Sequence, residues 1–598
     1  MKKTLVFTLI LSSLFTFSSS LFAADPPTAP MLRIETGMHT AVINRIGVDA
    51  QNRFLVTGSD EKTVRVWDLA SGNLLKILRP PIGESNEGKI NAVAISPDSS
   101  TVAAGGWTQF ADGSSETSPE GHNIYLFDRS TGAMKNRITG LPNVINHLAY
   151  SKDGKFLAAT LGAGKGIRVF RTDGTPAGED TDYGAASYWA DFDADGRLVT
   201  TCLDGFIRVY ESRTFRLAFR NKAQGGNQPY SAVFSPDGSK IAVGFNDSTN
   251  VDVLSTKDLT HLYSPSTAGV DNGDAGSVAW SYDGSTVFAG GRYYKGGQCP
   301  ILAWSQAGKG NVKEFIGADN GIQHILPLQN GGMVFGAAYP AFGVLSSSGK
   351  RILFQSSAIA DHRGLDKEGF RLSKNGKTVR FWYEQGGSSP AVFDSDARNF
   401  LSDKTASGLS SPDMQSLNIT DWKSSVSPKL NGTPLKLNQY ETSRSLAVSP
   451  AKDGFLLGAD WSLRFFDASG RELWNAPVPG AAWDVNIAPN GKVAAAAFGD
   501  GTIRWYRVSD GKELLAFFPH NDRKRWILFT PSGYYDASPG GAELVGWHQN
   551  RGADMAAEFT PFSKLKERFF RPDVVTKVLD TLSEEEALRQ ANKNAGKK

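Results

Sequence analysis

Cysteine is almost absent from this chain, with 2 Cys among 598 residues. That scarcity excludes a disulfide scaffold and a Cys-rich metal site. The 8 His are scattered without paired-ligand spacing, so we interpret them as structural and predict no metal. The formal net charge is +3, and removing Lys2 and Lys3 with the first 24 residues leaves about +1 (3 − 2). A basic field that would attract nucleic acid is therefore excluded.

The first residues have the pattern of a secretory signal. Lys2 and Lys3 precede an apolar run from Leu5 to Phe17, and Ala23-Ala24 offers a cleavage site. The apolar run is too short to span a membrane comfortably, and no later stretch approaches that length. We therefore expect residues 1–24 to be a cleaved signal peptide, and the mature chain to be periplasmic or secreted without an integral membrane segment.

A unit of roughly 40 residues recurs from about residue 43. Each unit has an alternating strand, a tight turn similar to S-P-D-G, a second strand, and a third strand similar to I-R-V-W-D. The turn occurs at 96–100, 151–155, 235–239, 281–285 and 488–492, and the third strand at 64–68, 124–128, 167–170, 207–210 and 503–506. Asp, Asn and Gly accept the backbone angles of a hairpin. The alternation predicts strands with one buried face each.

A lone four-stranded sheet cannot bury its faces, whereas a ring of such sheets can, so the repeat predicts an all-β fold of tandem β-propellers. The unit at 37–78 resembles a WD repeat, with Gly37-Met38-His39 near its start and Trp67-Asp68 at its end. In that family the His, an Asp before the third strand, and the Trp share a structural hydrogen-bond network. Glu61 stands here where the Asp is usual. The resemblance covers roughly residues 31–518, implies structural roles for His39, Trp67 and Asp68, and specifies fold and not function.

The repeat count predicts two propellers. Seven units lie between 43 and 355, and the later units at 370–403, 404–437, 444–474 and 482–518, with a possible twelfth at 526–559, exceed the usual limit of about eight blades in one ring. We expect a first propeller at 31–357 and a second, smaller or incomplete ring at 358–560. Residues 31–36 resemble a fourth strand without a blade and could close a ring.

The character of the sequence changes after residue 560, where helical spacing replaces alternation. We predict a helical tail at 561–598, with an apolar stripe of Val575, Val578, Leu579 and Leu582. The segments RWILFTPSGYYDASPGGAELVGWHQNRG at 525–552 and RFFRPDVVTKVLDTLSEEEALRQAN at 568–592 resemble the junction of bacterial proteins that fuse WD propellers to a caspase-like (metacaspase-type) peptidase domain. The resemblance implies the detached regulatory half of such a protease, with a separately encoded caspase-like protein as partner. On that hypothesis the stripe would be partly exposed, whereas burial would favour a capping role.

Catalytic and cofactor sites are not predicted. A caspase-like dyad needs a Cys beside a base His, but Cys202 and Cys299 both lie inside repeat units. The motif DFDADG at 191–196 has calcium-loop spacing, yet Cys202 replaces the Glu of the twelfth position, which favours a turn. FDASGRELW at 466–474 resembles the tryptophan-docking repeat of quinoproteins. The alternative to a non-enzymatic scaffold is therefore a quinoprotein-like dehydrogenase with a site in the propeller channel.

Two loop insertions carry aromatic residues of the types enriched at protein interfaces. They lie at 106–122 and 291–299, between the second and third strands of their units, and contain Trp107, Phe110, Tyr293 and Tyr294. Loops of this kind emerge on one face of a propeller. We expect the four side chains to be exposed there and to bind a protein partner. The alternative is that surface loops vary in length without functional meaning.

Overall fold

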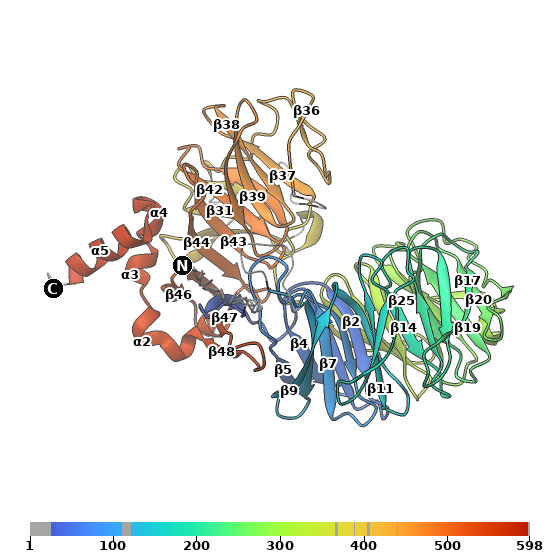
Figure 1. The fold of residues 1–598 in the computed structure, drawn as a ribbon. Helices are drawn as coiled ribbons and strands as arrows, with labels where there is room; N and C mark the ends of the chain where they lie inside the picture. The colour runs from blue at the N-terminus through green and yellow to red at the C-terminus, as the bar shows by residue number, and fades with distance from the viewer. Residues whose placement is uncertain are drawn as a thin grey trace, which may run out of the picture.

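The computed structural model describes residues 25–110, 121–364, 369–387, 389–402, 407–438 and 441–595. Figure 1 shows two bodies of β-sheet, one coloured blue to green and one yellow to red, with short helices on the outer side of the second. The sheets are antiparallel, and most contain four consecutive strands. The predicted all-β propeller fold is therefore confirmed.

Seven four-stranded sheets, here called blades 1 to 7, form the first body. Blade 1 contains β2 (Ile43–Val48), β3 (Phe54–Ser59), β4 (Val64–Asp68) and β5 (Leu74–Leu78), and blade 2 contains β6 (Ile90–Ile95), β7 (Thr101–Gly106), β8 (His122–Asp128) and β9 (Met134–Leu141). Blade 3 contains β10 (Ile145–Tyr150), β11 (Phe156–Leu161), β12 (Ile167–Arg171) and β13 (Pro176–Asp180), and blade 4 contains β14 (Trp189–Phe192), β15 (Leu198–Thr201), β16 (Phe206–Tyr210) and β17 (Leu217–Lys222). Blade 5 contains β18 (Pro229–Phe234), β19 (Lys240–Phe245), β20 (Val251–Ser255) and β21 (His261–Tyr263). Blade 6 contains β22 (Ser277–Trp280), β23 (Val287–Gly290), β24 (Cys299–Trp304) and β25 (Val312–Ala318), with the short helix η1 (Gln306–Gly308), and blade 7 contains β26 (Ile322–Pro327), β27 (Met333–Ala337), β28 (Ala341–Leu345) and β29 (Arg351–Ser356).

The seven blades form a closed ring, because each innermost strand packs on the next and β26 of blade 7 packs on β2 of blade 1. Val334 and Phe342 of blade 7 share a hydrophobic core with Ile43 and Ile46 of blade 1. Each blade keeps its own four strands. The ring therefore closes through side-chain packing and not through exchange of a strand.

The S-P-D-G turns join the first and second strands of their blades, as their sequence indicates. At 235–239 the Asp237 carboxylate accepts hydrogen bonds from the Ser235 hydroxyl and from the Ser239 N–H (3.1 Å). Gly238 has a φ of +67°, a conformation that favours glycine. The turn residues thus fix the hairpin, and the hairpin fixes the register of the two strands.

The second body is less regular. One sheet contains β30 (Arg371–Leu372), β31 (Thr378–Trp382), β32 (Pro390–Asp394) and β33 (Asn399–Leu401), with the short helix η2 (Gln385–Gly387), and the next contains β34 (Ile419–Thr420), β35 (Lys429–Leu430) and β36 (Thr433–Pro434). The third contains β37 (Ser443–Val448), β38 (Gly454–Ala459), β39 (Ser462–Asp467) and β40 (Glu472–Pro477). The fourth has six strands, β41 (Ala482–Ile487), β42 (Val493–Phe498), β43 (Ile503–Arg507), β44 (Glu513–Pro519), β45 (Trp526–Phe529) and β46 (Tyr535–Ala537). The six-stranded sheet packs on the β37 sheet through residues such as Val485 and Leu456, and on the β30 sheet through Val493 and Phe370.

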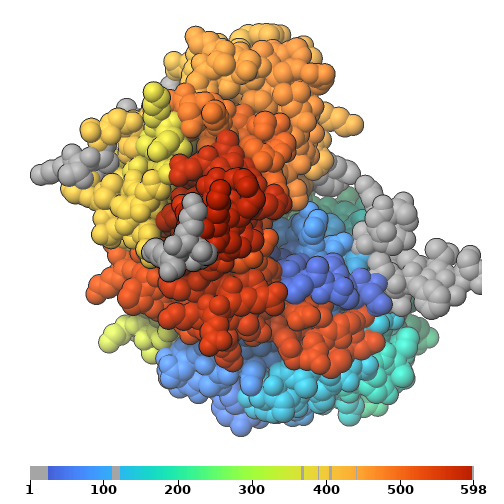
Figure 2. Space-filling model, turned by 90° about the vertical axis from the view of Figure 1, so that its left-hand side faces the viewer, coloured from blue at the N-terminus to red at the C-terminus, as the bar shows by residue number. Residues whose placement is uncertain are grey.

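The N-terminal strand belongs to the second body, and not to the first propeller where the sequence analysis places it. β1 (Met31–Ile34) pairs with β47 (Val545–Gln549), which pairs in turn with β48 (Glu558–Pro561). Figure 2 shows the dark blue N-terminal segment beside the red C-terminal region. The possible twelfth unit at 526–559 is likewise divided, because β45 and β46 extend the six-stranded sheet, whereas β47 follows the short helix η4 (Gly541–Glu543) and joins β1.

The C-terminal helices complete the core of the second body. They are η5 (Phe562–Leu565), α2 (Lys566–Phe569), α3 (Pro572–Val575), α4 (Val578–Thr581) and α5 (Glu584–Ala595). Val575, Val578 and Leu579 are 2%, 0% and 6% exposed, and they pack with Trp526 and Leu528 of β45. The expectation of a partly exposed stripe is therefore wrong for these three residues, since the helices fold back onto the six-stranded sheet and bury them, whereas Leu582 is only partly buried against the same core.

Polar contacts join the two bodies. The carboxylate of Glu35, directly after β1, accepts hydrogen bonds from Arg65 (2.8 Å) and Arg79 of the first propeller. Burial opposes the charge of Glu35, but the two guanidinium groups outweigh it and hold the pKa of Glu35 below its ordinary value. The buried Asn550 side chain, after β47, exchanges hydrogen bonds with the backbone of Ile82 (3.0 and 2.7 Å). These contacts fix the loop at 79–89, between blades 1 and 2, against the second body.

Candidate functional site: the channel mouth of the first propeller

The side chain of Arg45, on β2, occupies the centre of the first propeller. Its Nε donates to Nδ1 of His147 (2.9 Å), and its Nη1 and Nη2 donate to the Tyr230 hydroxyl (3.0 Å) and the Tyr188 carbonyl oxygen (3.1 Å). The guanidinium carbon also lies 5.2 Å from the ring centroid of Trp189. These partners belong to blades 3, 4 and 5, so a single guanidinium of blade 1 connects four blades by hydrogen bonds and a cation–π contact.

Two buried imidazoles flank this guanidinium. His147 stacks on Trp189 with ring centroids 4.5 Å apart, and His324 of blade 7 lies 5.7 Å from His147. Nδ1 of His324 accepts a hydrogen bond from the Ile46 N–H (3.2 Å). Burial, reinforced by the charge of Arg45, lowers the pKa of both histidines well below the usual value. Both rings are therefore neutral at pH 7, and their Nδ1 atoms are already occupied as acceptors.

Four of the side chains around the channel opening come from one repeated position. In blades 1, 2, 3 and 5 the innermost strand skips one residue in its pairing, and the skipped residues are Asn44, Asn91, Asn146 and Tyr230. A β-bulge redirects a side chain and recurs at functional edges. All four residues line a pocket of about 440 Å³, here called the channel mouth, which is within the size range of ligand sites.

The channel mouth is polar and aromatic, and it also contains three charged side chains. Its other lining residues are Arg45, Asp60, Asn86, Lys89, Trp107, Tyr188 and Trp461, the last contributed by the second body. The Asp60 carboxylate accepts a hydrogen bond from the Asn44 amide (2.6 Å) and lies 3.9 Å from the Lys89 ammonium. The pocket therefore offers amide groups and aromatic faces beside an Asp60–Lys89 pair and the guanidinium of Arg45, whose hydrogen-bond partners are neutral groups.

The structure separates the four aromatic residues predicted for partner binding. Trp107 and Tyr294 are 42% and 51% exposed, and Trp107 lies at the channel mouth. Phe110 and Tyr293 are only 5% and 2% exposed. Tyr293 packs in the core between blades 5 and 6 and its hydroxyl donates to the Gly269 carbonyl oxygen (3.1 Å). The expected exposure of Phe110 and Tyr293 is therefore wrong, because both side chains are buried; the rest of the insertion after Phe110, residues 111–120, lies outside the described residues.

The WD-type residues of blade 1 lie together, apart from Asp68. Nε2 of His39 and the Trp67 indole N–H both contact the Thr57 hydroxyl (2.6 and 2.9 Å), and Nδ1 of His39 lies 2.7 Å from the Glu61 carboxylate. Glu61 thus occupies the place where Asp is usual. Asp68 instead caps the next turn, where it accepts hydrogen bonds from the N–H and hydroxyl of Ser71 (2.8 and 2.7 Å).

Other motifs have structural explanations. Cys202 and Cys299 are buried in blades 4 and 6, and burial raises the pKa of each thiol to about 11. In the DFDADG motif, Asp193 accepts hydrogen bonds from the backbone and side chain of Arg197 (2.8 and 2.6 Å), as expected for a turn. Within the described residues, His, Cys, Asp and Glu form no group of three or more that could hold a metal ion. Among those same residues, no helix has the length and apolarity needed to cross a membrane.

Sequence reasoning missed Arg45, His147 and His324, although a signal was present. The innermost strands of blades 1, 3 and 7 begin Ile-Asn-Arg at 43–45, Ile-Asn-His at 145–147 and Ile-Gln-His at 322–324. Two polar residues after a buried Ile interrupt the alternating pattern at the same place in three repeats. Alignment of the repeats would have placed all three basic residues at the ring centre.

Comparison with known families gives one match. Residues 34–68 match the family model described as WD domain, G-beta repeat. That stretch contains β3, β4 and the contacts among His39, Thr57 and Trp67. None of the curated proteins compared with the chain matches it. The match supports a WD-repeat protein and, in general terms, a role in protein interaction.

Proposed function

We propose that this protein is an exported, non-enzymatic scaffold that binds a protein partner through the loop face of the first propeller. The observation that carries the proposal is Trp107, a large aromatic side chain that is 42% exposed beside the concave channel mouth. Exposed Trp and Tyr residues at such rims are typical anchors of protein interfaces. Tyr294, on the corresponding loop of blade 6, would provide a second contact.

The chemistry of the ring interior supports binding over catalysis. Arg45 is committed to hydrogen bonds across the ring, and the neighbouring histidines have their Nδ1 atoms occupied. The two cysteine thiols are buried with raised pKa values, so neither is a ready nucleophile. The alternative of a quinoprotein-like dehydrogenase has less support, because Arg45, His147 and His324 occupy the centre of the propeller, where its site would lie.

Export and the identity of the partner are further parts of the proposal. The pattern of residues 1–24 supports a cleaved signal peptide and a periplasmic or secreted protein. The resemblance at 525–592 suggests a separately encoded caspase-like protein as partner. Because Val575, Val578 and Leu579 are buried, such a partner would have to use another surface of the molecule.

The test is capture of partners by the mature protein from an extract of its own source, with mass spectrometry and then affinity measurement on the purified partner. The double variant Trp107→Ala, Tyr294→Ala should weaken binding by about 2 kcal/mol or more, which is roughly thirtyfold. Tyr282→Ala is the matched control, because Tyr282 is 57% exposed and lies in an S-P-D-G-type turn, at the opposite end of its strands. Equal affinities of the double variant and the unchanged protein would contradict the proposed binding face.

A further inference from the structure

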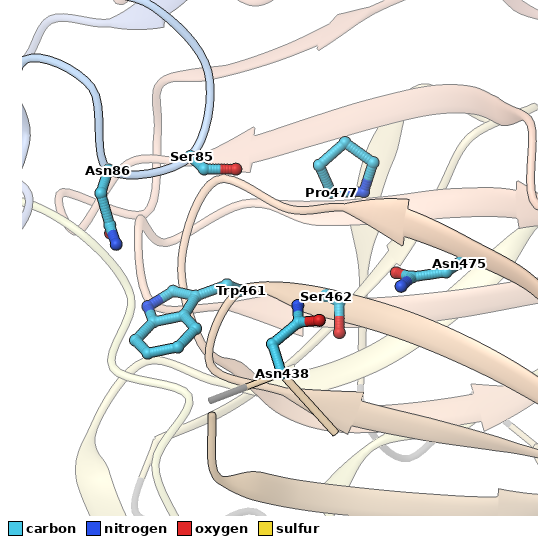
Figure 3. Close-up of a pocket in the computed structure, with 7 residues that line it drawn as sticks. All are labelled: Ser85, Asn86, Asn438, Trp461, Ser462, Asn475 and Pro477. Atoms are coloured by element: carbon cyan, nitrogen blue, oxygen red, sulfur yellow. The ribbon is translucent and has the colours of Figure 1, made fainter. Parts of the chain in front are cut away.

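A second pocket adjoins the channel mouth and is walled by both bodies. It has a volume of about 430 Å³ and is lined by Ser85, Asn86, Asn438, Trp461, Ser462, Asn475 and Pro477. We call it the amide groove. Figure 3 shows the seven side chains around one opening, with Trp461 between Asn86 and Asn438 in this view. Asn86 and Trp461 also line the channel mouth, so the two pockets are adjacent.

The amides of the groove are free to bind a ligand. Within the described part of the chain, the side-chain amides of Asn86, Asn438 and Asn475 make no hydrogen bond to protein, and neither does the indole N–H of Trp461. By contrast, Asn486 and Asn550, buried elsewhere, use their amides to bind backbone carbonyl oxygens. Each amide presents two N–H donors and an acceptor oxygen. The groove therefore concentrates unused donors and acceptors beside an indole ring.

The charged side chains near the groove are buried in the protein behind it and do not line it. Arg464 and Glu441 are buried there, and their side chains pair with each other (2.8 Å). The Ser462 hydroxyl donates to Glu441 and accepts from Nε of Arg464 (2.9 Å). None of the seven lining residues is ionisable at neutral pH. The groove itself therefore offers no counter-ion to a charged ligand, which favours a neutral one there.

The wall is fixed before any ligand arrives. Ser85 and Asn86 belong to the loop at 79–89, which the buried Asn550 holds by its hydrogen bonds to Ile82. The buried Lys62 ammonium donates to the Gly83 carbonyl oxygen of the same loop (2.8 Å). Trp461 follows β38 in a two-residue turn, and its carbonyl oxygen accepts from the Val478 N–H (3.2 Å). A preformed wall reduces the ordering cost of binding.

We propose that the amide groove binds a neutral oligosaccharide, with one pyranose ring on the face of Trp461 and sugar hydroxyls hydrogen-bonded to Asn86, Asn438 and Asn475. Each pyranose ring has an apolar patch of C–H groups with hydroxyl groups around its edge. The patch can stack on an aromatic ring while the hydroxyl groups form hydrogen bonds with the surrounding amides. The adjacent channel mouth, with Asn44, Asn91, Asn146 and further aromatic rings, would provide room for a chain of several sugars. This inference is independent of the partner-binding proposal.

A peptide fits the groove less well. Peptides that bind in grooves commonly insert apolar side chains into apolar pockets or pair with charged groups. Ligand pockets in general are lined mainly by hydrophobic residues with a few polar groups. Across the two pockets, the lining includes six Asn, four aromatic residues and no Leu, Ile, Val or Met, and the charged residues Arg45, Asp60 and Lys89 lie in the channel mouth and not in the amide groove. That composition matches a ligand whose surface is mostly hydroxyl.

The test is titration calorimetry and tryptophan fluorescence on the mature full chain with cellohexaose, maltohexaose, chitohexaose and mannohexaose. A hexamer of galacturonic acid and a neutral Gly-Ser hexapeptide are the comparison ligands. We expect saturable binding of at least one neutral hexasaccharide with a change in tryptophan emission. Trp461→Ala should weaken it by about tenfold or more, because stacked aromatic anchors carry much of such binding energy. Asn475→Ala should weaken it by a smaller factor.

The matched control is Asn399→Ala, an exposed Asn on β33 of the same body and outside both pockets. It should bind the sugar as the unchanged protein does, and thermal unfolding should show that all variants are folded. Absence of binding by all four neutral sugars at millimolar concentration would overturn the proposal, as would binding by the Gly-Ser peptide alone. Sugar binding that survives both Trp461→Ala and Asn475→Ala would place the site elsewhere and also overturn it. Weaker partner binding by Tyr294→Ala with intact sugar binding would separate the two proposals, because Tyr294 lines neither pocket.

Discussion

Both bodies have a β-bulge near the start of innermost strands, but the residue at the bulge differs between them. In blades 1, 2 and 3 the residue skipped in the innermost strand is Asn, and it faces the channel mouth. In the second body the skipped residues are Arg444 and Trp483, and the guanidinium of Arg444 lies 5.2 Å from the Trp483 ring centroid. Arg444 also pairs with Asp460 (2.7 Å). One repeat geometry thus provides a pocket in one body and a closed cation–aromatic pair in the other.

The bodies also differ in how their sheets are held together. The first is a ring of equal blades, closed by packing of blade 7 on blade 1 and connected across its centre by Arg45. The second has sheets of three, four and six strands, and its main core includes residues of the C-terminal helices. We infer that the first body depends on ring closure and the second on its helical tail. The following changes test that difference.

Removal of residues 561–598 should have the largest effect, and only on the second body. Val574, Val575, Val578 and Leu579 would leave the core, and each buried aliphatic side chain contributes about 1.5–3 kcal/mol. The sum is comparable with the whole stability of a domain, about 5–15 kcal/mol. Limited proteolysis should then degrade the second body and leave a protected fragment of the first. Equal protection of both bodies would show that the tail is dispensable.

Arg45→Ala should destabilise the first propeller by about 3–5 kcal/mol, because it removes hydrogen bonds from a charged donor to three other blades and leaves the buried His147 without its partner. The matched control is Arg444→Ala in the second body. The ion pair of Arg444 is partly exposed and its loss should cost about 1 kcal/mol or less. Urea unfolding followed by tryptophan fluorescence compares the two. Similar costs for both variants would contradict a central role for Arg45.

More of the fold than of the candidate site could be predicted from the sequence. Turn residues and alternation act locally, so they identified the strands of the first propeller and the helical tail. The pairing of β1 with β47 joins residues about 500 positions apart, and nothing local at 31–34 specifies it. The same holds for Arg45, whose partners at 147, 188 and 230 meet only when the ring closes. Phe110 and Tyr293 failed as predicted anchors because residue type does not determine which way a loop aromatic turns.

Acid should lower the free energy of unfolding of both bodies. The loss for each buried histidine should be smaller than the loss caused by Arg45→Ala. Burial lowers the pKa of His122 in the first body to about 4 and of His548 in the second to about 3. Unfolded histidine has a pKa of about 6.5, so between that value and the folded pKa the unfolded state binds the extra proton and stability falls as pH falls. Between pH 7 and pH 5 each histidine should remove about 2 kcal/mol.

The measurement is the free energy of unfolding in urea at pH 7 and pH 5. His122→Asn should reduce the acid loss of the first body alone, and His548→Asn that of the second alone. Each variant therefore serves as the control for the other. An acid loss that is unchanged in both variants would show that other groups cause it.

The smallest expected effect is that of Glu61→Asp, which would restore the usual Asp of the WD-type network. Its carboxylate contacts His39 (2.7 Å) and Arg65 (2.9 Å), and accepts from the Thr40 hydroxyl (3.0 Å). Glu61→Asp keeps the charge but shortens the side chain by one methylene, so it should lose some of these contacts at a cost of about 1 kcal/mol. Glu61→Gln keeps the length and removes the charge beside the buried Arg65, and should cost more. Urea unfolding of the two variants checks the order. If Asp proves neutral or stabilising, the network tolerates the usual residue, and the longer side chain here serves chiefly to reach Arg65.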